Sequence, residues 1–211
     1  MISPEAVAPQ TLATPIAAAS GRAVTAAQLR AADLAVGGPA ARAGGLSGAG
    51  LKIGIISDSF NLSGQAAAEQ AAGLLPANGV TVLEEGPAGS GDEGMAMAEL
   101  VHATAPAAQL YFYSGYYSEQ DMAAGVAALR AAGCQIIVDD ISYADEPMFQ
   151  IAGPIDTAVQ AAVSAGVDVL DELLPQAVSA TPATSTTPTP ASIRPRGVTV
   201  ILGTLELLSW E

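Results

Sequence analysis

The chain has 211 residues, half of them hydrophobic, a formal net charge of −14 at pH 7 and a single cysteine. This length fits one domain, or one domain with tails. Seven Lys and Arg residues against 21 acids cannot neutralise much phosphate, so we expect no nucleic-acid partner and no anionic membrane partner. One cysteine excludes an intrachain disulfide and a cysteine-based zinc site, and we expect no metal or other cofactor.

Residues 1–45 are rich in Ala, Pro and Gly, which predicts a poorly ordered linker or the end of a prosegment. Within this segment, Thr25 is a suitable N-cap for a short helix that reaches Val36. The start at Met1 lacks the basic region and the apolar run of a signal peptide, so we expect none and leave the compartment open. No run approaches the roughly 20 apolar residues of a membrane span.

Residues 46–170 alternate between short apolar runs and Ala-rich helical runs. The apolar runs predict strands at 52–57, 79–83, 109–113, 135–138 and 167–170. The helical runs predict helices at 64–75, 93–103, 118–132 and 154–165. Strands of nearly continuous apolar residues are typical of a sheet that is covered on both faces. We therefore predict a three-layer α/β domain with a parallel sheet and right-handed crossovers.

Residues 171–211 form a predicted tail. Its central part, 180–190, contains only Thr, Pro, Ser and Ala, and a short apolar end with the only Trp follows. That composition cannot bury enough apolar surface to order itself.

Acidic residues follow the predicted strands at three places. Asp58 ends the first strand, Glu93 opens a helix, and Asp139 and Asp140 follow the strand at 135–138. In parallel sheets functional groups collect at the carboxyl ends of the strands, so these acids predict a carboxylate cluster at one edge. Each also has a structural alternative: Asp58 as a turn residue, Glu93 as a plain helix acid, and the pair as a solvated loop start.

Two segments, Gly-Leu-Lys-Ile-Gly-Ile-Ile-Ser-Asp-Ser-Phe at 50–60 and Asp-Glu-Gly-Met-Ala-Met-Ala-Glu-Leu-Val-His-Ala-Thr-Ala-Pro at 92–106, resemble the first two catalytic segments of the subtilase family. This family comprises the subtilisin and sedolisin serine peptidases. The resemblance implies that Asp58 orients a general base. It implies that the base is Glu93, thirteen residues before Pro106, where subtilisins have His and sedolisins have Glu.

The segment 137–143 resembles the subtilase strand that ends in one wall of the substrate cleft. The resemblance therefore implies substrate-binding roles for Asp140, Ser142 and Tyr143. It implies a subtilisin-like fold that is incomplete at its C-terminal side.

The sequence also departs from the family pattern. Met97 stands where sedolisins support the base with an Asp, and no Ala-Gly-Asn segment follows Gly166. No Gly-Thr-Ser nucleophile segment is recognisable either. His102 lies nine residues after Glu93 and on another face of the helix, so we expect a structural role and keep it as the fallback base.

The resemblance predicts a serine endopeptidase lineage that acts on a peptide or protein substrate. Because the nucleophile and oxyanion segments are missing, we expect the chain as given to be truncated and inactive. One alternative is a non-catalytic peptide-binding module that keeps the cleft. A small-molecule enzyme that uses the carboxylates with a divalent cation is the last alternative.

Overall fold

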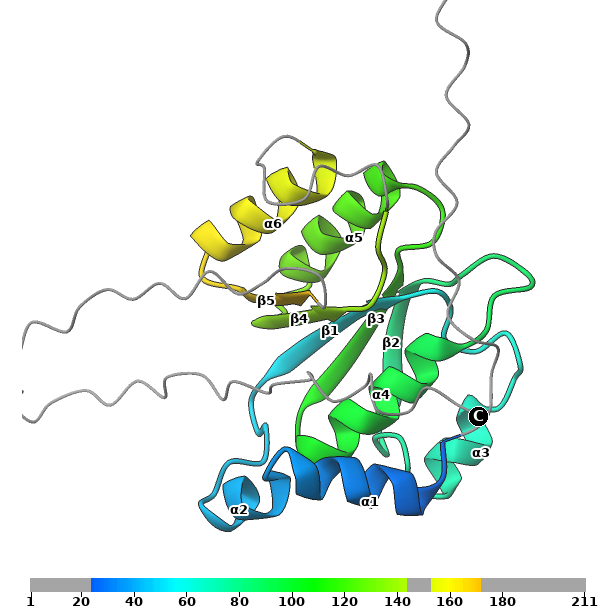
Figure 1. Ribbon diagram of the computed structural model, residues 1–211, viewed down its shortest axis with the longest axis vertical. Helices are drawn as coiled ribbons and strands as arrows, with labels where there is room; N and C mark the ends of the chain where they lie inside the picture. The colour runs from blue at the N-terminus through cyan, green and yellow to red at the C-terminus, as the bar shows by residue number, and fades with distance from the viewer. Residues whose placement is uncertain (1–23, 144–152, 172–211) are drawn as a thin grey trace, which may run out of the picture.

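The computed structural model describes residues 24–143 and 153–171. The strands are β1 (Lys52–Ser57), β2 (Val80–Glu84), β3 (Gln109–Ser114), β4 (Ile136–Asp139) and β5 (Asp168–Asp171). The helices are α1 (Ala26–Ala35), α2 (Gly38–Ala43), α3 (Ala66–Ala71), α4 (Glu93–Thr104), α5 (Glu119–Ala131) and α6 (Pro154–Ser164). All five strands are parallel and lie in the order β2-β3-β1-β4-β5 (Figure 1).

The predicted α/β class with a parallel sheet is confirmed, and each predicted strand is present within one residue of its expected bounds. Two helices differ from the prediction. The helix predicted at 64–75 is confined to Ala66–Ala71, because its chain turns at Gly73, whose φ is 75°. Helix α2 was not predicted, since its six residues include Gly38, Pro39 and three alanines and carry no apolar period.

Helices cover both faces of the sheet and form two separate cores. Ile55 and Ile56 are adjacent in β1, so their side chains point to opposite faces. Ile55 packs in a cluster with residues of α4, whereas Ile56 packs in a cluster with residues of α5 and α6. Both isoleucines are fully buried, which establishes three layers (Figure 1).

One crossover has the opposite hand to the other three. The connections β2–α4–β3, β3–α5–β4 and β4–α6–β5 all run in the same direction across the sheet, yet α4 lies on the opposite face from α5 and α6. The connection β1–α3–β2 runs the other way, and Ala66 of α3 packs on the α4 side. Because about 98% of such crossovers are right-handed, β2–α4–β3 is the left-handed one. This corrects the expectation that all crossovers are right-handed.

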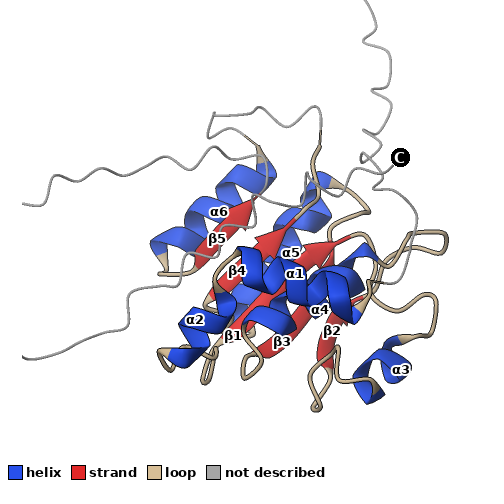
Figure 2. Cartoon of the chain, turned by 60° about the horizontal axis from the view of Figure 1, so that its bottom comes forward, coloured by secondary structure: helices blue, strands red, loops and turns tan. Residues whose placement is uncertain are grey.

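The predicted helix after Thr25 is confirmed as α1, and Thr25 and Gln28 form a capping box. Both α1 and α2 lie against α4 (Figure 2). Arg42 joins them: its guanidinium binds both carboxylate oxygens of Asp33, at 2.7 and 2.6 Å, and also the carbonyl oxygens of Ala103 and Thr104. Residues 25–43 are therefore anchored to the last turn of α4, and the boundary at residue 45 stays a prediction.

The predicted tail at 172–211 and the first 23 residues lie outside the described residues. Among the residues that the structure describes, no helix is long and apolar enough to cross a membrane. Cys134 is buried in the cluster under α5 and α6, where it packs as a small hydrophobic residue.

Candidate functional site

Asp58 follows β1 directly and its carboxylate binds the segment that leads into α4. Its Oδ1 accepts hydrogen bonds from the backbone N–H groups of Ser59 at 2.5 Å and Glu93 at 2.9 Å. Its Oδ2 accepts one from the N–H of Gly91 at 2.6 Å. The side chain is 7% exposed. Asp58 and Glu93, the two predicted catalytic residues, are thus brought together by a direct hydrogen bond.

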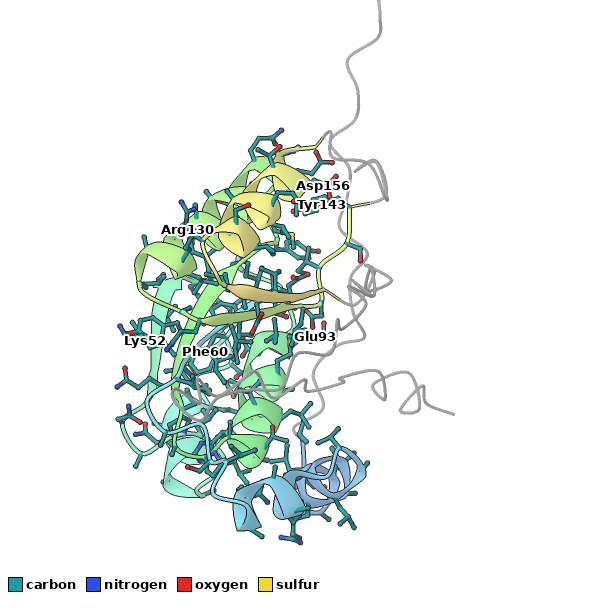
Figure 3. The ribbon with its side chains drawn as sticks, turned by 90° about the vertical axis from the view of Figure 1, so that its left-hand side faces the viewer. Lys52, Phe60, Glu93, Arg130, Tyr143 and Asp156 are labelled. Atoms are coloured by element: carbon teal, nitrogen blue, oxygen red, sulfur yellow. The ribbon has the colours of Figure 1, made fainter. Side chains whose placement is uncertain are left out.

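Glu93 is the first residue of α4, which places its carboxylate at the positive end of the helix dipole. It is half-buried. Figure 3 shows Glu93 on the same side of the molecule as Tyr143, with Lys52 on the opposite side. Since Lys52 begins β1, Glu93 lies at the carboxyl edge of the sheet. The bond that Glu93 makes with Asp58 runs through its backbone N–H, so Asp58 positions the main chain of the predicted base.

Asp92 precedes Glu93 and binds the loop that follows β1. Its carboxylate accepts hydrogen bonds from the N–H groups of Leu62 and Ser63, both at 2.7 Å, and from the hydroxyl of Ser59 at 2.9 Å. Burial alone would raise the pKa of Asp92, but the hydrogen bonds from Ser63, Leu62 and Ser59 outweigh it, and the pKa lies below its usual value.

Glu85, just after β2, completes the set of acids around this loop. Its Oε1 accepts from the N–H groups of Phe60 and Gly86, and its Oε2 from the N–H of Asn61. Together with Asp58 and Asp92, it supplies an acceptor for every backbone N–H from 59 to 63. Three carboxylates therefore supply the hydrogen-bond acceptors that a helix or sheet would otherwise provide for this loop.

The predicted substrate-binding residues follow β4, which lies beside β1. Ile56 pairs with Asp139, so Asp139 and Asp140 are at the same sheet edge as Asp58. Asp139 is buried and Asp140 is half-buried. The hydroxyl of Tyr143 donates to the carbonyl oxygen of Gly115 at 2.6 Å, and its side chain is 6% exposed. Tyr143 thus packs as part of the core under α6, while Ser142 is half-buried on the edge.

The fallback base His102 lies near the other end of α4, in its last turn, far along the helix from Glu93. Burial lowers its pKa, so the imidazole is neutral over a wider pH range than usual. The same helix carries Glu99, which is 3% exposed. Burial, and secondarily the charge of Glu69 on α3, raises the pKa of Glu99 to about 7.

A second group of acidic residues, at the carboxyl ends of β2 and β3, was not predicted. The hydroxyl of Tyr113 in β3 lies 3.3 Å from Asp121 of α5, and Glu84 at the end of β2 also interacts with this hydroxyl. Burial, followed by the charge of Glu84, raises the pKa of Asp121. The phenol has one proton to donate to two carboxyl groups.

Asp92 and Glu85 are the site residues that sequence reasoning missed. Both lie in the Gly-rich segment 84–94, and nothing in their spacing indicates that they bind a loop some 30 residues earlier. One signal was available: residues 59–63 have no helical or strand pattern, so their backbone N–H groups need hydrogen-bond acceptors from elsewhere in the chain. Among the described residues, no group of three or more His, Cys, Asp or Glu side chains could hold a metal ion.

A scan against protein-family models finds no family that matches this chain, and a search of curated proteins finds no matching relative.

Proposed function

We propose that residues 46–170 are the N-terminal part of a subtilase-type serine endopeptidase domain, which holds an extended peptide and supplies Asp58 and Glu93. The observation that carries the proposal is the hydrogen bond from the Glu93 N–H to Asp58, which joins the two matched segments at one sheet edge. Two acids that are 35 residues apart meet where parallel sheets place their functional groups.

The topology adds independent support. Glu93 opens α4, and α4 belongs to the single left-handed crossover, a connection found in only about 2% of such units. A domain of subtilase lineage must share this strand order and this hand. Superposition on an experimental subtilase domain therefore tests the lineage, and a right-handed connection at the equivalent helix would count against it.

In a complete domain, the carboxylate of Glu93 would take the proton of a serine nucleophile. A carboxylate can act as such a base when partial burial raises its proton affinity. Asp58 contributes by holding the main chain of Glu93 and Gly91 in place. The peptide would lie along the extended backbone after β4, at Asp140 and Ser142, as an added strand.

A non-catalytic peptide-binding module is the second candidate. It is favoured by the hydrogen bonds of the Asp58 carboxylate to three backbone N–H groups, which give this residue a complete structural role. Such a module would keep the peptide cleft and need no nucleophile.

The test measures hydrolysis of fluorescent casein and binding of extended peptides by fluorescence anisotropy, both with the full chain. We expect saturable binding without turnover. Ser142→Pro should weaken binding because proline removes the backbone donor at this position. Asp168→Asn, a change at an exposed residue, serves as the matched control.

The outcomes separate the candidates. Turnover that is lost in Glu93→Gln would support the lineage and overturn the expected inactivity. Binding that is unchanged in Glu93→Gln and absent in Ser142→Pro would favour the peptide-binding module. Absence of both binding and turnover would refute the proposal.

A further inference from the structure

Asp92 has an unusual backbone for an aspartate that begins a helix. Its φ and ψ are 56° and 33°, and among the described residues it is the one non-glycine residue with a positive φ. An N-cap aspartate normally accepts a hydrogen bond from the second or third N–H of its own helix. Asp92 makes no such bond, because the left-handed backbone turns its carboxylate elsewhere.

The carboxylate of Asp92 is directed at the loop after β1. It accepts from Leu62 and Ser63, and it forms a reciprocal pair with Ser59. In this pair the Ser59 hydroxyl donates to the Asp92 carboxylate at 2.9 Å and accepts from the Asp92 N–H at 2.7 Å. The Ser59 side chain is fully buried, so water cannot substitute for these bonds.

These contacts close a ring that contains the predicted base. The N–H of Ser59 and the N–H of Glu93 both donate to Oδ1 of Asp58. Ser59 is bonded to Asp92, and Asp92 is covalently linked to Glu93. The place of Glu93 is therefore set from two sides, through Asp58 and through Asp92.

We propose that Asp92 is a positioning residue, which couples the loop 59–63 to the N-terminus of α4 and so sets the place of Glu93. A left-handed backbone is strained for a residue with a side chain and persists only where surrounding contacts hold it. Here those contacts are the bonds to Ser59, Leu62 and Ser63. The importance of Glu93 rests on the proposed function, whereas the coupling can be measured without any activity.

The experiment is amide hydrogen exchange by NMR on the full chain, for the wild type and three variants of Asp92. Asp92→Asn keeps a left-handed preference and one acceptor oxygen, Asp92→Gly keeps only the backbone freedom, and Asp92→Ala keeps neither. We expect exchange of the Glu93 and Gly91 amides to accelerate about tenfold in the Gly variant and more in the Ala variant, with partial rescue in the Asn variant.

The matched control is Glu85→Ala, because Glu85 binds the same loop through the N–H groups of Phe60 and Asn61, and its third hydrogen bond is to the N–H of Gly86, outside α4. This variant should release the amides of Phe60 and Asn61 and leave the Glu93 amide protected. Protection of the Ile55 amide in each variant reports that the sheet remains folded.

Two results would overturn the proposal. In the first, the Gly variant protects Glu93 as well as the wild type does, so the carboxylate has no part in positioning it. In the second, the variants release only Leu62 and Ser63, so Asp92 is a local loop residue. Either result leaves the peptide-binding and casein measurements unaffected, and those measurements decide the proposed function separately.

Discussion

Asp58 is itself buried, and its side chain satisfies three backbone donors through one buried and two partly buried hydrogen bonds. The turn alternative considered for Asp58 is part of what is observed, since one of its bonds is to the next residue, Ser59. The other two bonds reach a segment more than thirty residues away. At this position a local structural role and a role in the site coincide.

The first prediction concerns this carboxylate. Asp58→Ala leaves one buried and two partly buried N–H groups without their acceptor, and each lost bond costs about 1 kcal/mol. We expect the free energy of unfolding to fall by about 3 kcal/mol in urea titrations. Asp168→Ala, at an exposed strand end, should change it by less than about 0.5 kcal/mol. Equal effects of the two substitutions would contradict this account of Asp58.

The second prediction concerns Gly94, next to Glu93. A Cβ at this position would lie 2.3 Å from the ring of Phe112 and 2.7 Å from the backbone oxygen of Ser59. We expect Gly94→Ala to destabilise the fold by about 1–3 kcal/mol, although alanine favours helices. Urea unfolding of a double-mutant cycle with Phe112→Leu checks the cause: the smaller side chain should recover part of the loss. Strict additivity of the two substitutions would exclude the ring as the obstacle.

At the scale of elements, α4 is held at both ends by side chains from elsewhere. Asp58 binds the N–H groups before and at its first residue, and Arg42 binds the carbonyl oxygens of Ala103 and Thr104 in its last turn. Each partner complements the helix dipole at its end. The helix that carries Glu93 is therefore positioned by its two termini as well as by its buried face.

The third prediction tests the C-terminal end of α4. Lysine cannot reproduce the fork that Arg42 presents to Asp33 together with its bonds to two carbonyl oxygens. We expect Arg42→Lys to cost about 1–2 kcal/mol of unfolding free energy and to accelerate amide exchange in α1 and the last turn of α4. Arg30→Lys, on the exposed side of α1, is the control. Unchanged exchange in α1 would mean that its packing on α4 does not need this arginine.

The elements were predictable from sequence because local signals agree with the fold. Thr25 caps its helix as expected, Ser118 caps the helix predicted at 118–132, and the apolar runs at Lys52–Ser57 and Gln109–Ser114 form the expected strands. The hand of the α4 crossover was not predictable, since it depends on which face α4 occupies. The candidate site was predictable only in part. The placement of Asp58 and Glu93 at one sheet edge follows from the rule that functional groups collect at the carboxyl ends of parallel strands. The contacts of Asp92 depend on its left-handed backbone and on long-range hydrogen bonds, which residue spacing does not reveal.

At the scale of the whole molecule, the prediction concerns pH. Burial, and to a smaller degree the charge of Glu69, raises the pKa of Glu99 to about 7. A raised pKa stabilises the fold below the pKa of the unfolded chain, and this contribution is lost as the pH rises through 7. The contribution of Asp121 to stability changes with pH in the same direction, because its pKa is also raised. The lowered pKa values of Asp92 and His102 have the opposite effect: Asp92 costs stability only in strong acid, and His102 costs stability below its usual pKa of 6.5.

We therefore expect the free energy of unfolding to be highest in mildly acidic solution and to fall by about 2 kcal/mol between pH 5 and pH 8. Urea titrations across this range measure it. Glu99→Gln should flatten most of the decline, whereas Glu69→Gln should make the decline smaller and complete at a lower pH, because the charge of Glu69 helps to raise the pKa of Glu99. A profile that rises from pH 5 to pH 8 in the wild type would contradict this assignment.

Because of the left-handed crossover, the helices on the two faces of the sheet are synthesised one group after the other. Helices α1 to α4 all precede β3 and cover one face of the sheet, whereas α5 and α6 follow β3 and cover the other (Figure 1). A nascent chain that has emerged from the ribosome as far as Ser114 thus contains the helices that cover Ile55 but, among the described residues, neither of the helices that cover Ile56. Until α5 emerges, no described helix covers that side of β1 and β3, and transiently exposed apolar surface of this kind is prone to aggregation.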